Sequence, residues 1–457
     1  MFSRPSHVLI AALIPLTAIT ASGQMIQEHA KLIPSDGSIG QVFGTSVAIH
    51  RGITAIGSHR DRTNGTSSGS AYLYDSYTNE QLFKLLPDDG AATNEFGISV
   101  ALNNDVVAVG AWFDDENGHG SGSVYLFDTD TGIQISKIVP DDGVVSANFG
   151  VTLAIDENIL AVGAYRDDDN GEWSGSVYLY DVNTSTQLAK LLPDDGEAFQ
   201  FFGGSVAIND GIVVVGTTQD DDNGANAGAA YLFDVTSGNQ LAKLLPDDGA
   251  PGDAFGLSVA IEEDIVAIGA WTNQSNGITS GSVYTFSALT FEQTAKLIPN
   301  DPTDLQLFGS SLDIYNGHLA IGARAFDFKG TGERFGSAYL FDTATGEELT
   351  KLVPSDLALG DNFGASIGIY GPNVVVGSPF DQDNGQESGS AYTFDIGLTL
   401  CPADLYQDGQ INHFDISALL SAYLAQDPIA DFNHDGMYNF FDVSLFLQAY
   451  QEGCSIF

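Results

Sequence analysis

Short runs of apolar residues recur along most of the chain, and they are rich in β-branched and aromatic side chains. In the unit that begins at Phe96 the runs are ISVAL, VVAVGA, GSVYLFD and QISKIVP, and Gly, Asn and Asp fill the connections between them. Val, Ile, Tyr and Phe favour strands, whereas Gly, Asn and Asp favour turns. The pattern therefore predicts a unit of four short β-strands.

This unit occurs seven times. A Phe-Gly pair begins at successive steps of 53, 53, 53, 53, 53 and 55 residues, at Phe43, Phe96, Phe149, Phe202, Phe255, Phe308 and Phe363. A KLLP-like stretch keeps the same step, at Lys31, Lys84, Lys137, Lys190, Lys243, Lys296 and Lys351. Four strands repeated at this period are typical of a propeller blade.

The two ends of the repeated region complement each other. The last unit offers GASIGI, NVVVGS and GSAYTFD but has no KLLP-like strand after them, while AKLIP at residues 30–34 precedes the first unit. If the N-terminal strand completes the last blade, both free sheet edges are hidden. We therefore predict an all-β, seven-bladed propeller over residues 24–397.

The repeat resembles a known family. The run FGISVALNNDVVAVGA followed by GSVYLF is similar to FG-GAP repeats, the blades of the integrin α-subunit propeller and of many exported bacterial proteins. The resemblance extends over roughly residues 30–396. In integrin blades calcium lies in an Asp-rich loop between the first and second strands. Here those connections are short, as in LNND and IDEN, so we do not expect those calcium sites.

The charge balance narrows the class of partner. Lys and Arg number 15 and Asp and Glu number 60, which gives a net charge of −45 over 457 residues. Such a surface repels nucleic acid and anionic lipid, and it favours cations or cationic patches of other proteins. An acidic surface that serves only solubility is the competing interpretation.

The N-terminal residues predict export. Arg4 precedes an apolar run over residues 8–20, and Ala-Ser-Gly at 21–23 is a small-residue cleavage site. This is the pattern of a secretory signal peptide over residues 1–23, with Gln24 as the first mature residue. No other stretch approaches the ~20 apolar residues that span a bilayer. We expect an exported, soluble protein.

One face of the predicted propeller concentrates acidic loops. In a four-stranded meander the connections after strands two and four emerge on the same face, and both are acidic here, as in RDDDNG and PDDG. Clustered Asp and Asn oxygens could hold calcium, or they could cap turns by hydrogen bonds. The position two residues after the strand-two glycine varies most, so it is our candidate ligand face for a protein or glycan: His59, Trp112, Tyr165, Trp271 and Arg324. Packing against neighbouring loops is the alternative role of these side chains.

Sequence motifs give little support for catalysis. The histidines share no repeat position, and no H-E-x-x-H helix occurs. The G-x-S-x-G matches GTSSG at residues 65–69 and GASIG at residues 364–368 lie within the β-repeat and precede no predicted helix, so neither is a nucleophile elbow. Carboxylate pairs suited to glycoside hydrolysis are too numerous for one pair to be singled out.

The last 60 residues, 398–457, have a different pattern. DFNHDGMYNFFD supplies oxygen ligands and a glycine at the spacing of a calcium loop, through Asp431, Asn433, Asp435, Met437 (by its carbonyl), Asn439 and Asp442. A second copy lies upstream at Asp404, Asp408, Gln410, Asn412 and Asp415, with Tyr406 in place of one ligand. An apolar amphipathic run follows each loop and predicts a helix. We therefore expect a small α-helical, EF-hand-like domain that binds Ca²⁺.

These two loop–helix units resemble a dockerin, and the closing Gly-Cys is similar to GC-type dockerins of exported bacterial proteins. The resemblance implies a cohesin-like partner or another cell-surface scaffold protein. The positions that help cellulosomal dockerins to select a cohesin hold His413, Phe414, Phe440 and Phe441, which form a candidate docking surface unlike the usual small hydroxyl residues. Cys401 and Cys454 are the only cysteines, and in an oxidising compartment they can pair across this domain.

Three functions remain open from the sequence. The first is a non-catalytic binding protein, anchored by its C-terminal domain to the surface of a bacterial cell. The second is a polysaccharide-degrading enzyme carried by the same tail. The third is a structural component of a surface layer that associates with itself.

Overall fold

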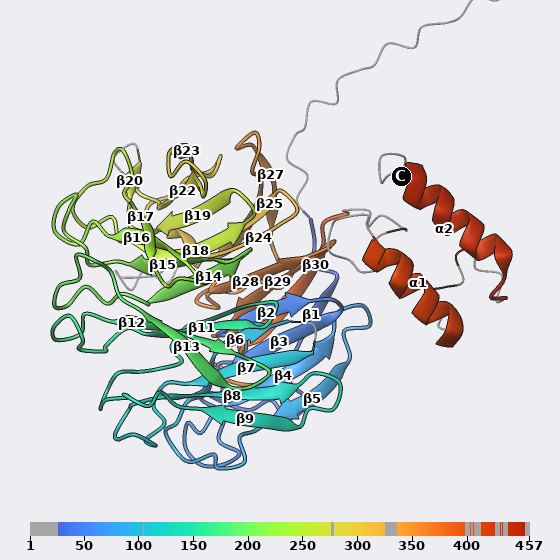
Figure 1. Ribbon diagram of the computed structural model, residues 1–457, viewed down its shortest axis with the longest axis horizontal. Helices are drawn as coiled ribbons and strands as arrows, with labels where there is room; N and C mark the ends of the chain where they lie inside the picture. Colours follow the sequence, from blue (N-terminus) through green and yellow to red (C-terminus); the bar gives the residue numbers. More distant parts are fainter. Residues whose placement is uncertain are drawn as a thin grey trace, which may run out of the picture.

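The computed structural model describes residues 26–103, 105–275, 278–324, 336–397, 403, 405, 413–425, 430, 432 and 437–452. Seven antiparallel sheets of four strands follow one another in chain order, and they form the body drawn from blue to orange in Figure 1. The prediction of a seven-bladed propeller with four-stranded blades is confirmed.

The strands are short, and each blade runs from its first strand to its fourth. The first three blades consist of β2 (Val47–His50), β3 (Ile53–Ser58), β4 (Ser70–Asp75) and β5 (Gln81–Leu85); β6 (Phe96–Leu102), β7 (Val106–Ala111), β8 (Ser123–Asp128) and β9 (Gln134–Ile138); and β10 (Leu153–Asp156), β11 (Ile159–Ala164), β12 (Ser176–Asp181) and β13 (Thr186–Leu191). The next three consist of β14 (Ser205–Asn209), β15 (Ile212–Thr217), β16 (Ala229–Asp234) and β17 (Gln240–Leu244); β18 (Phe255–Glu262), β19 (Ile265–Ala270), β22 (Ser282–Ser287) and β23 (Gln293–Leu297); and β24 (Phe308–Tyr315), β25 (His318–Ala323), β26 (Ser337–Asp342) and β27 (Glu348–Leu352). A two-stranded ribbon, β20 (Gln274–Ser275) and β21 (Ile278–Thr279), lies in the loop between β19 and β22.

The seventh blade is completed by the N-terminal strand, as predicted. It contains β28 (Ser366–Tyr370), β29 (Asn373–Ser378) and β30 (Ser390–Asp395), and β1 (Ala30–Leu32) pairs antiparallel with β30. A parallel bridge between Phe43 and Gly389 joins the seventh blade to the first, and equivalent bridges join neighbouring blades elsewhere. In Figure 1 the blue and orange ends of the propeller accordingly lie side by side. The ring therefore closes through hydrogen bonds between the two ends of the repeated region.

Buried aromatic side chains fill the space between blades. Phe96 lies at the start of β6, and its ring meets Tyr125 at 5.5 Å and Phe127 at 5.8 Å between centroids, both edge-to-face. These three side chains have almost no exposed surface. Edge-to-face contact is a favoured geometry for aromatic pairs. The Phe of the Phe-Gly pair and the third-strand Tyr therefore belong to the core between blades.

Neighbouring blades approach so closely that one strand position requires glycine. A Cβ added to Gly216 in β15 would lie 2.0 Å from the backbone oxygen of Gly256 in the next blade and 2.3 Å from the Ser205 hydroxyl. That hydroxyl donates a hydrogen bond of 2.8 Å to the same Gly256 oxygen. The second-strand glycine thus leaves room for a hydrogen bond that joins two blades.

Two helices lie in the C-terminal segment: α1 (His413–Ala425) and α2 (Phe440–Glu452). They follow the two predicted loops, and their small core contains Ala403, Leu419, Ala430, Phe446 and Ala449. Among the described residues, no helix is long and apolar enough to cross a membrane. The helices are confirmed, while the EF-hand-like arrangement of the loops stays a prediction.

Several predicted residues lie outside the described part of the chain. They are the signal peptide, residues 1–23, the two cysteines, Cys401 and Cys454, and the loop positions Asp404, Asp408, Gln410, Asn412, Asp431, Asn433 and Asp435.

Gly216→Ala tests the close approach of the blades. We expect it to lower the free energy of unfolding by about 3 kcal/mol, because the new methyl group meets a backbone oxygen that cannot move aside. Chemical denaturation monitored by circular dichroism measures this loss. Gly368→Ala is the control, since its added Cβ meets a side-chain carbon of Ile49 at 3.2 Å, and we expect a loss below about 1 kcal/mol. Equal losses for the two variants would contradict this account.

Candidate ligand-binding face

The loops that follow the second and fourth strands of each blade emerge on one face, which we call the loop face. At each junction a loop from one blade lies against the loop that leads into the next blade. For example, the backbone N–H groups of Glu95 and Phe96 donate to the carbonyl oxygens of Ser67 and Ser68, both at 3.1 Å. The loop face is therefore built from pairs of hydrogen-bonded loops rather than from independent ones.

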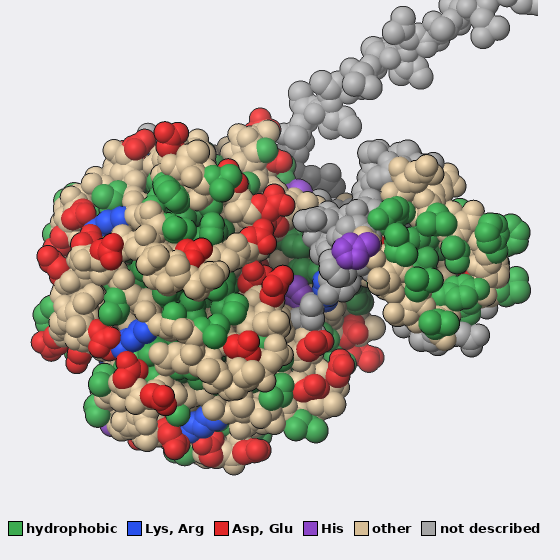
Figure 2. All heavy atoms as spheres, in the orientation of Figure 1, with side chains coloured by type: hydrophobic (Ala, Val, Ile, Leu, Met, Phe, Trp, Pro, Cys, Tyr) green, Lys and Arg blue, Asp and Glu red, His purple; other side chains and the backbone are tan. Residues whose placement is uncertain are grey.

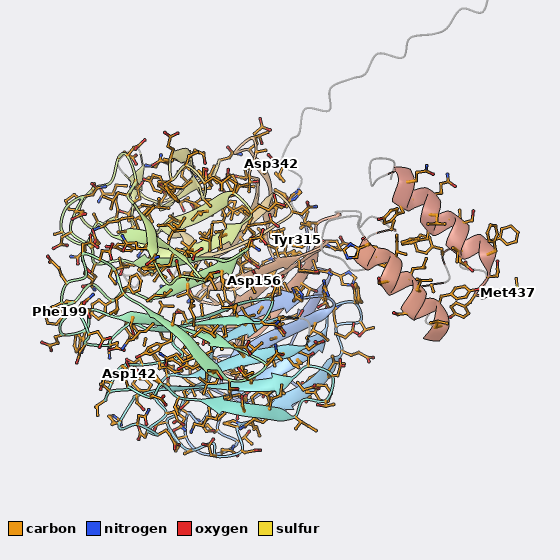
Figure 3. The ribbon with its side chains drawn as sticks, viewed as in Figure 1. Asp142, Asp156, Phe199, Tyr315, Asp342 and Met437 are labelled. Atoms are coloured by element: carbon orange, nitrogen blue, oxygen red, sulfur yellow. The ribbon has the colours of Figure 1, made fainter. Side chains whose placement is uncertain are left out.

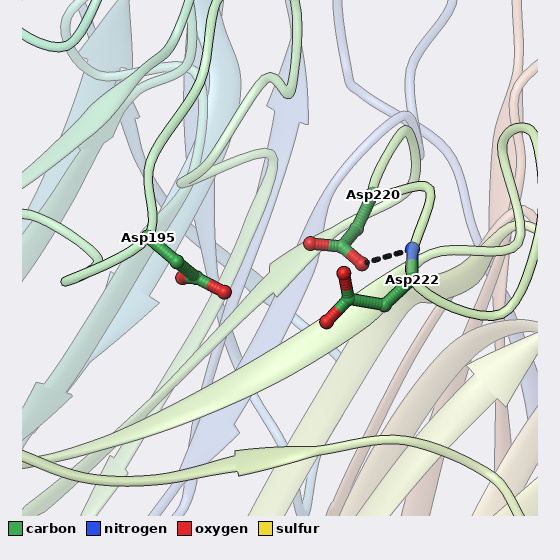
Figure 4. Close-up of side chains that lie close together, drawn as sticks. All are labelled: Asp195, Asp220 and Asp222. Atoms are coloured by element: carbon green, nitrogen blue, oxygen red, sulfur yellow. Dashed lines mark hydrogen bonds between the residues drawn. The ribbon is translucent and has the colours of Figure 1, made fainter.

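The acidic clusters of the loop face surround lysine side chains. The Lys243 ammonium lies 2.7 Å from Asp195, 2.8 Å from Asp220 and 2.7 Å from Asp222. Asp195 comes from the loop between β13 and β14, whereas Asp220 and Asp222 follow β15, and Figure 4 shows these three carboxylates close together. The Lys243 ammonium therefore joins two parts of the loop face. The Tyr231 hydroxyl also donates to Asp195 and Asp220, at 3.0 and 3.2 Å.

The same contact recurs at every blade. Each KLLP-type lysine forms an ion pair with an aspartate of the loop that enters its own blade: Lys31 with Asp356, Lys84 with Asp36, Lys137 with Asp89, Lys190 with Asp142, Lys243 with Asp195, Lys296 with Asp248, and Lys351 with Asp301. Because Lys31 lies in β1 and its blade is the seventh, the Lys31–Asp356 pair also ties the N-terminal strand into the ring. Figure 2 shows the result on the visible side of the propeller, where isolated Lys and Arg side chains lie among Asp and Glu.

The lysine and aspartate side chains of these ion pairs stabilise each other's charged forms. Burial lowers the pKa of Lys243, but hydrogen bonds to Asp195, Asp220 and Asp222 outweigh burial and raise the pKa above its usual value. Burial likewise raises the pKa of Asp195, but hydrogen bonds from Lys243 and Tyr231 outweigh it and lower the pKa. The ammonium thus lies where a cation would lie in a calcium site.

The sequence left two interpretations of the acidic loops, calcium binding and turn capping. Two described clusters have carboxylate oxygens close enough together to share a metal ion: Asp195, Asp220 and Asp222, and Asp356, Asp381 and Asp383. A lysine ammonium already bonds all three members of each cluster. Asp220 also caps its own turn, since it accepts the Asp222 N–H at 3.1 Å. The carboxylates of these two clusters therefore bond a lysine, and Asp220 also caps a turn.

A second contact between the loops pairs a side-chain amide with an acid. Asn94 donates to Asp114 at 2.8 Å. At a later junction the two residue types are exchanged, and Asn273 donates to Asp253 at 2.8 Å. The last junction has acids at both positions, Asp361 and Asp381. Burial and then the charge of Asp381 raise the pKa of Asp361, whose buried Oδ1 has no hydrogen-bond partner among the described residues.

The predicted ligand residues lie directly after the second strands, and the structure brings four of them together in two pairs. Trp112 stacks on Tyr165, with 6.3 Å between ring centroids and 22° between planes, and its Nε1 donates to Glu95 at 2.8 Å. The Arg324 guanidinium lies 4.6 Å from the centre of the Trp271 ring. These side chains are only half-buried.

His59 stands apart from these pairs and is half-buried on the first blade. Its Nδ1 lies 3.1 Å from the Thr45 hydroxyl. Burial, and then the charge of Arg60, lower the pKa of His59 to about 4. The ring is therefore neutral at pH 7.

The structure adds a group that the sequence comparison missed, at the junction of the third and fourth blades. We call it the aromatic junction, and it consists of Tyr165, Arg166, Trp173, Phe199 and Phe201. Its aromatic rings lie 5.7 to 5.8 Å from their neighbours, and Phe199 projects from a loop at the periphery of the propeller (Figure 3). A pocket of about 280 Å³ lies beside it. Of its members only Tyr165 was among the predicted ligand residues, because we compared one variable position per repeat and the other four occupy different positions.

The described part of the C-terminal domain is compatible with calcium. Asp415 and Asp442 begin the two helices and are fully buried, which a carboxylate tolerates only with a polar or cationic partner. Asp442 accepts the Asn439 N–H at 2.8 Å, and the Asn439 side chain caps Phe441 and donates to the carbonyl of Met437. Hard oxygen donors of this kind are the ligands that calcium takes.

The candidate docking residues lie at the start of the two helices. Phe440 and Phe441 are 76% and 67% exposed, and His413 is also exposed. The side chain of Phe414 lies outside the described residues.

Comparison with known families agrees with this geometry. A family model described as FG-GAP repeat matches the chain at residues 26–74, 80–127, 133–180, 185–233, 239–286, 291–341 and 347–394. Each match runs from the fourth strand of one blade to the third strand of the next, so every match spans a blade junction. A comparison with curated proteins found no match.

Lys243→Ala tests whether the lysine takes the place of a cation. We expect it to lower the free energy of unfolding by about 2 kcal/mol in chelator, because three carboxylates lose their common partner. Millimolar calcium should restore part of the loss, measured as the difference in melting temperature between variant and wild type.

Lys84→Ala provides the matched control. Lys84 bonds Asp36, Asp61 and the hydroxyl of Thr63, so its removal leaves two carboxylates rather than three. Calcium should therefore restore less stability to this variant. An identical response of wild type and both variants to calcium would show that the cluster does not act as a cation site without its lysine.

Asp361→Asn tests the pair of acids at the last junction. Because the folded state raises the pKa of Asp361, this carboxyl favours folding below its unfolded pKa of about 3.9, and that contribution is lost as the pH rises through the folded pKa. Asparagine stays neutral and can donate to Asp381, so we expect a gain of about 1 kcal/mol at pH 7 that disappears below pH ~4. Denaturant titrations between pH 3 and 8 measure it. Asp253→Asn, which replaces the charged acceptor of the Asn273 amide by a neutral one, should give no gain, and a gain for both variants would contradict the assignment.

Proposed function

Because the chain belongs to the FG-GAP repeat family, we propose that its propeller is a non-catalytic binding module whose loop face holds a protein or glycan ligand. The observation that supports this proposal is that some repeat positions are constant whereas others vary. Lys, Asp, Tyr and Gly recur at the blade junctions, whereas the positions after the second strands hold different aromatic, basic or small residues. A constant propeller with variable side chains on its loop face suits ligand recognition, because these side chains can change without a change of fold.

The lysine-bonded carboxylates of the loop face favour binding over catalysis. A carboxylic general acid needs a raised pKa, and hydrogen bonds from lysine and tyrosine lower the pKa of Asp89, Asp142 and Asp195 instead. Those carboxylates are therefore ionised at neutral pH and already bonded. A polysaccharide-degrading enzyme would need a different pair of carboxyl groups.

The C-terminal domain completes the proposal. We infer that the protein is exported by residues 1–23 and held at the bacterial cell surface by a calcium-dependent, dockerin-like tail. Support comes from the calcium-loop pattern, from the burial of Asp415 and Asp442, and from the exposed rings of Phe440 and Phe441. A cohesin-like domain or another scaffold protein is the expected partner, and the same tail would fix a structural surface-layer component.

The anchor is tested on the full-length mature protein. The protein is immobilised and exposed to cell-envelope extract of the source bacterium in calcium or in chelator, and the retained proteins are identified by mass spectrometry. We expect one envelope protein to be retained only in calcium, because the exposed surface of α1 and α2 depends on filled loops. Asp431→Ala/Asp435→Ala should abolish retention. Residues 24–397 alone provide the control for binding by the propeller.

Three outcomes separate the alternatives. Retention that persists in chelator and in the double variant would overturn the calcium-dependent anchor. Retention of the protein's own copies alone would favour a surface-layer component. Release of reducing sugar from polysaccharides by the purified protein would favour an enzyme.

A further inference from the structure

Three equivalent loop positions adopt a left-handed backbone at five of the six blade junctions that the structure describes in full, and Thr279 is the one exception at the sixth. At the aromatic junction they are Trp173, Phe199 and Phe201, with φ values of 55°, 66° and 58°. At the other junctions that the structure describes, these positions hold non-aromatic residues: Ser67, Thr93 and Glu95; Gly120, Ser146 and Asn148; Asn226, Gly252 and Ala254; Thr279, Leu305 and Leu307; Glu387, Gly40 and Val42. The seven repeats thus provide an internal comparison, and one junction differs from the rest.

Aromatic residues at these positions are unfavourable for the fold alone. A positive φ suits Gly and Asn, and it strains a bulky side chain. Burial does not fully offset that strain, since Trp173 remains 37% exposed and Phe199 45% exposed. Strained residues that a fold could replace at little cost often belong to a binding or catalytic site. The three aromatic side chains therefore point to a ligand.

The aromatic junction also contains a positive charge without an acidic partner. The Arg166 guanidinium lies 5.0 Å from the centre of the Tyr165 ring and 5.1 Å from that of Trp173. In the described part of the chain, Arg166 forms no ion pair with a carboxylate, and its buried Nε lacks a hydrogen-bond partner. The pocket beside it is lined by Tyr165, Arg166, Phe201, Thr218 and Gln219, among others. Tyr165, Arg166 and Phe201 thus belong both to the aromatic junction and to the lining of the pocket, whereas the exposed rings of Trp173 and Phe199 lie outside that lining.

The charges limit the class of ligand. A net charge of −45 repels polyanions from the whole surface, and Arg166 repels cations from this pocket. A neutral ligand experiences neither force. Sugars offer an apolar ring face for stacking on Trp173 or Phe199 and hydroxyl oxygens that accept from Arg166. The pocket, at about 280 Å³, holds a small group rather than an extended peptide.

We propose that the aromatic junction binds a sugar unit of a neutral glycan, with Trp173 and Phe199 as the stacking surface and Arg166 as a hydrogen-bond donor. This inference rests on the proposed binding function of the loop face and narrows its ligand to one chemical class and one blade junction.

The test uses the full-length mature protein and native affinity electrophoresis. Gels contain neutral polysaccharides (xyloglucan, galactomannan or a mixed-linkage β-glucan), anionic alginate, cationic chitosan, or no polymer. Retarded mobility with a neutral polymer is followed by calorimetric titration with oligosaccharides of that polymer. We expect Trp173→Asn and Arg166→Gln each to raise the Kd about tenfold or more.

A stability measurement separates a ligand role from a packing role. Asparagine adopts a positive φ more easily than tryptophan, so Trp173→Asn should keep or raise the melting temperature while it weakens binding. If Trp173 serves only to pack the two loops, the same change lowers the melting temperature and leaves glycan binding unaltered. Glu387→Asn, at the equivalent position of the seventh blade, is the matched control and should change neither quantity.

The outcomes distinguish this inference from the wider proposal. Binding of a neutral glycan that is lost in both variants supports the sugar site. Unchanged binding in both variants places the glycan elsewhere and overturns the site. Retardation only by alginate or chitosan overturns the neutral ligand. If no polymer retards the protein, the sugar site is wrong, whereas a protein ligand captured by residues 24–397 from envelope extract would still uphold the binding function of the loop face.

Discussion

The contact on which the propeller depends is the ion pair between a lysine of one blade and an aspartate of the loop that enters it. The lysine follows its aspartate by 48 residues in five of the blades, because the chain must complete nearly one whole blade before the two groups meet. The third-strand tyrosine donates to the same aspartate, and the lysine lies over the tyrosine ring, as Lys190 does over Tyr178 at 4.8 Å. The KLLP stretch, the PDDG loop and the Gly-Ser-x-Tyr strand are thus parts of a single junction.

This arrangement explains why so acidic a chain can close into a ring. The protein has eight lysines, and seven of them occupy these junctions. Each of the seven is partly buried, with 14 to 24% of its side chain exposed, so salt screens these pairs less than it screens the surplus carboxylates outside them. Where a lysine ammonium lies between two or three carboxylates of neighbouring loops, its attraction to them outweighs the repulsion between the carboxylates. The same contacts engage the acids of the loop face, which leaves recognition to the variable side chains among them.

The fold was predictable from the sequence because its signals are local or strictly periodic. Strand patterns, the Phe-Gly step and the unpaired N-terminal strand depend on residues whose spacing is visible along the chain. The role of lysine was less visible, although Lys84 and its equivalents marked the repeat, since the partner of Lys84 lies 48 residues earlier in the loop that enters the blade and no short motif contains both. The sequence also held a sign of contact between two loops. The Asn94–Asp114 pair of one blade is reversed as Asp253–Asn273 in another, and two positions that exchange residue types while they keep one hydrogen bond must be in contact. The aromatic junction was recognised from backbone φ angles, which the identity of a single residue does not reveal.

A closed repeat has a further consequence for how function can arise in it. Each junction must keep its lysine, its acids and its close glycine, so only loop positions outside that set can change without weakening the ring. A bulky residue at a left-handed position costs about 1 to 3 kcal/mol, and six other junctions stabilise the same closed structure. The closed propeller can therefore tolerate backbone strain at one junction that an isolated blade could not. Other junctions place single bulky residues at left-handed positions, as with Val42 and Leu307, but only the junction of the third and fourth blades holds aromatic residues at all three among those described. That set is the expected mark of selection for binding there, because selection for stability alone would favour Gly, Ser or Asn, as at the equivalent positions of the neighbouring junction that follows Gly118.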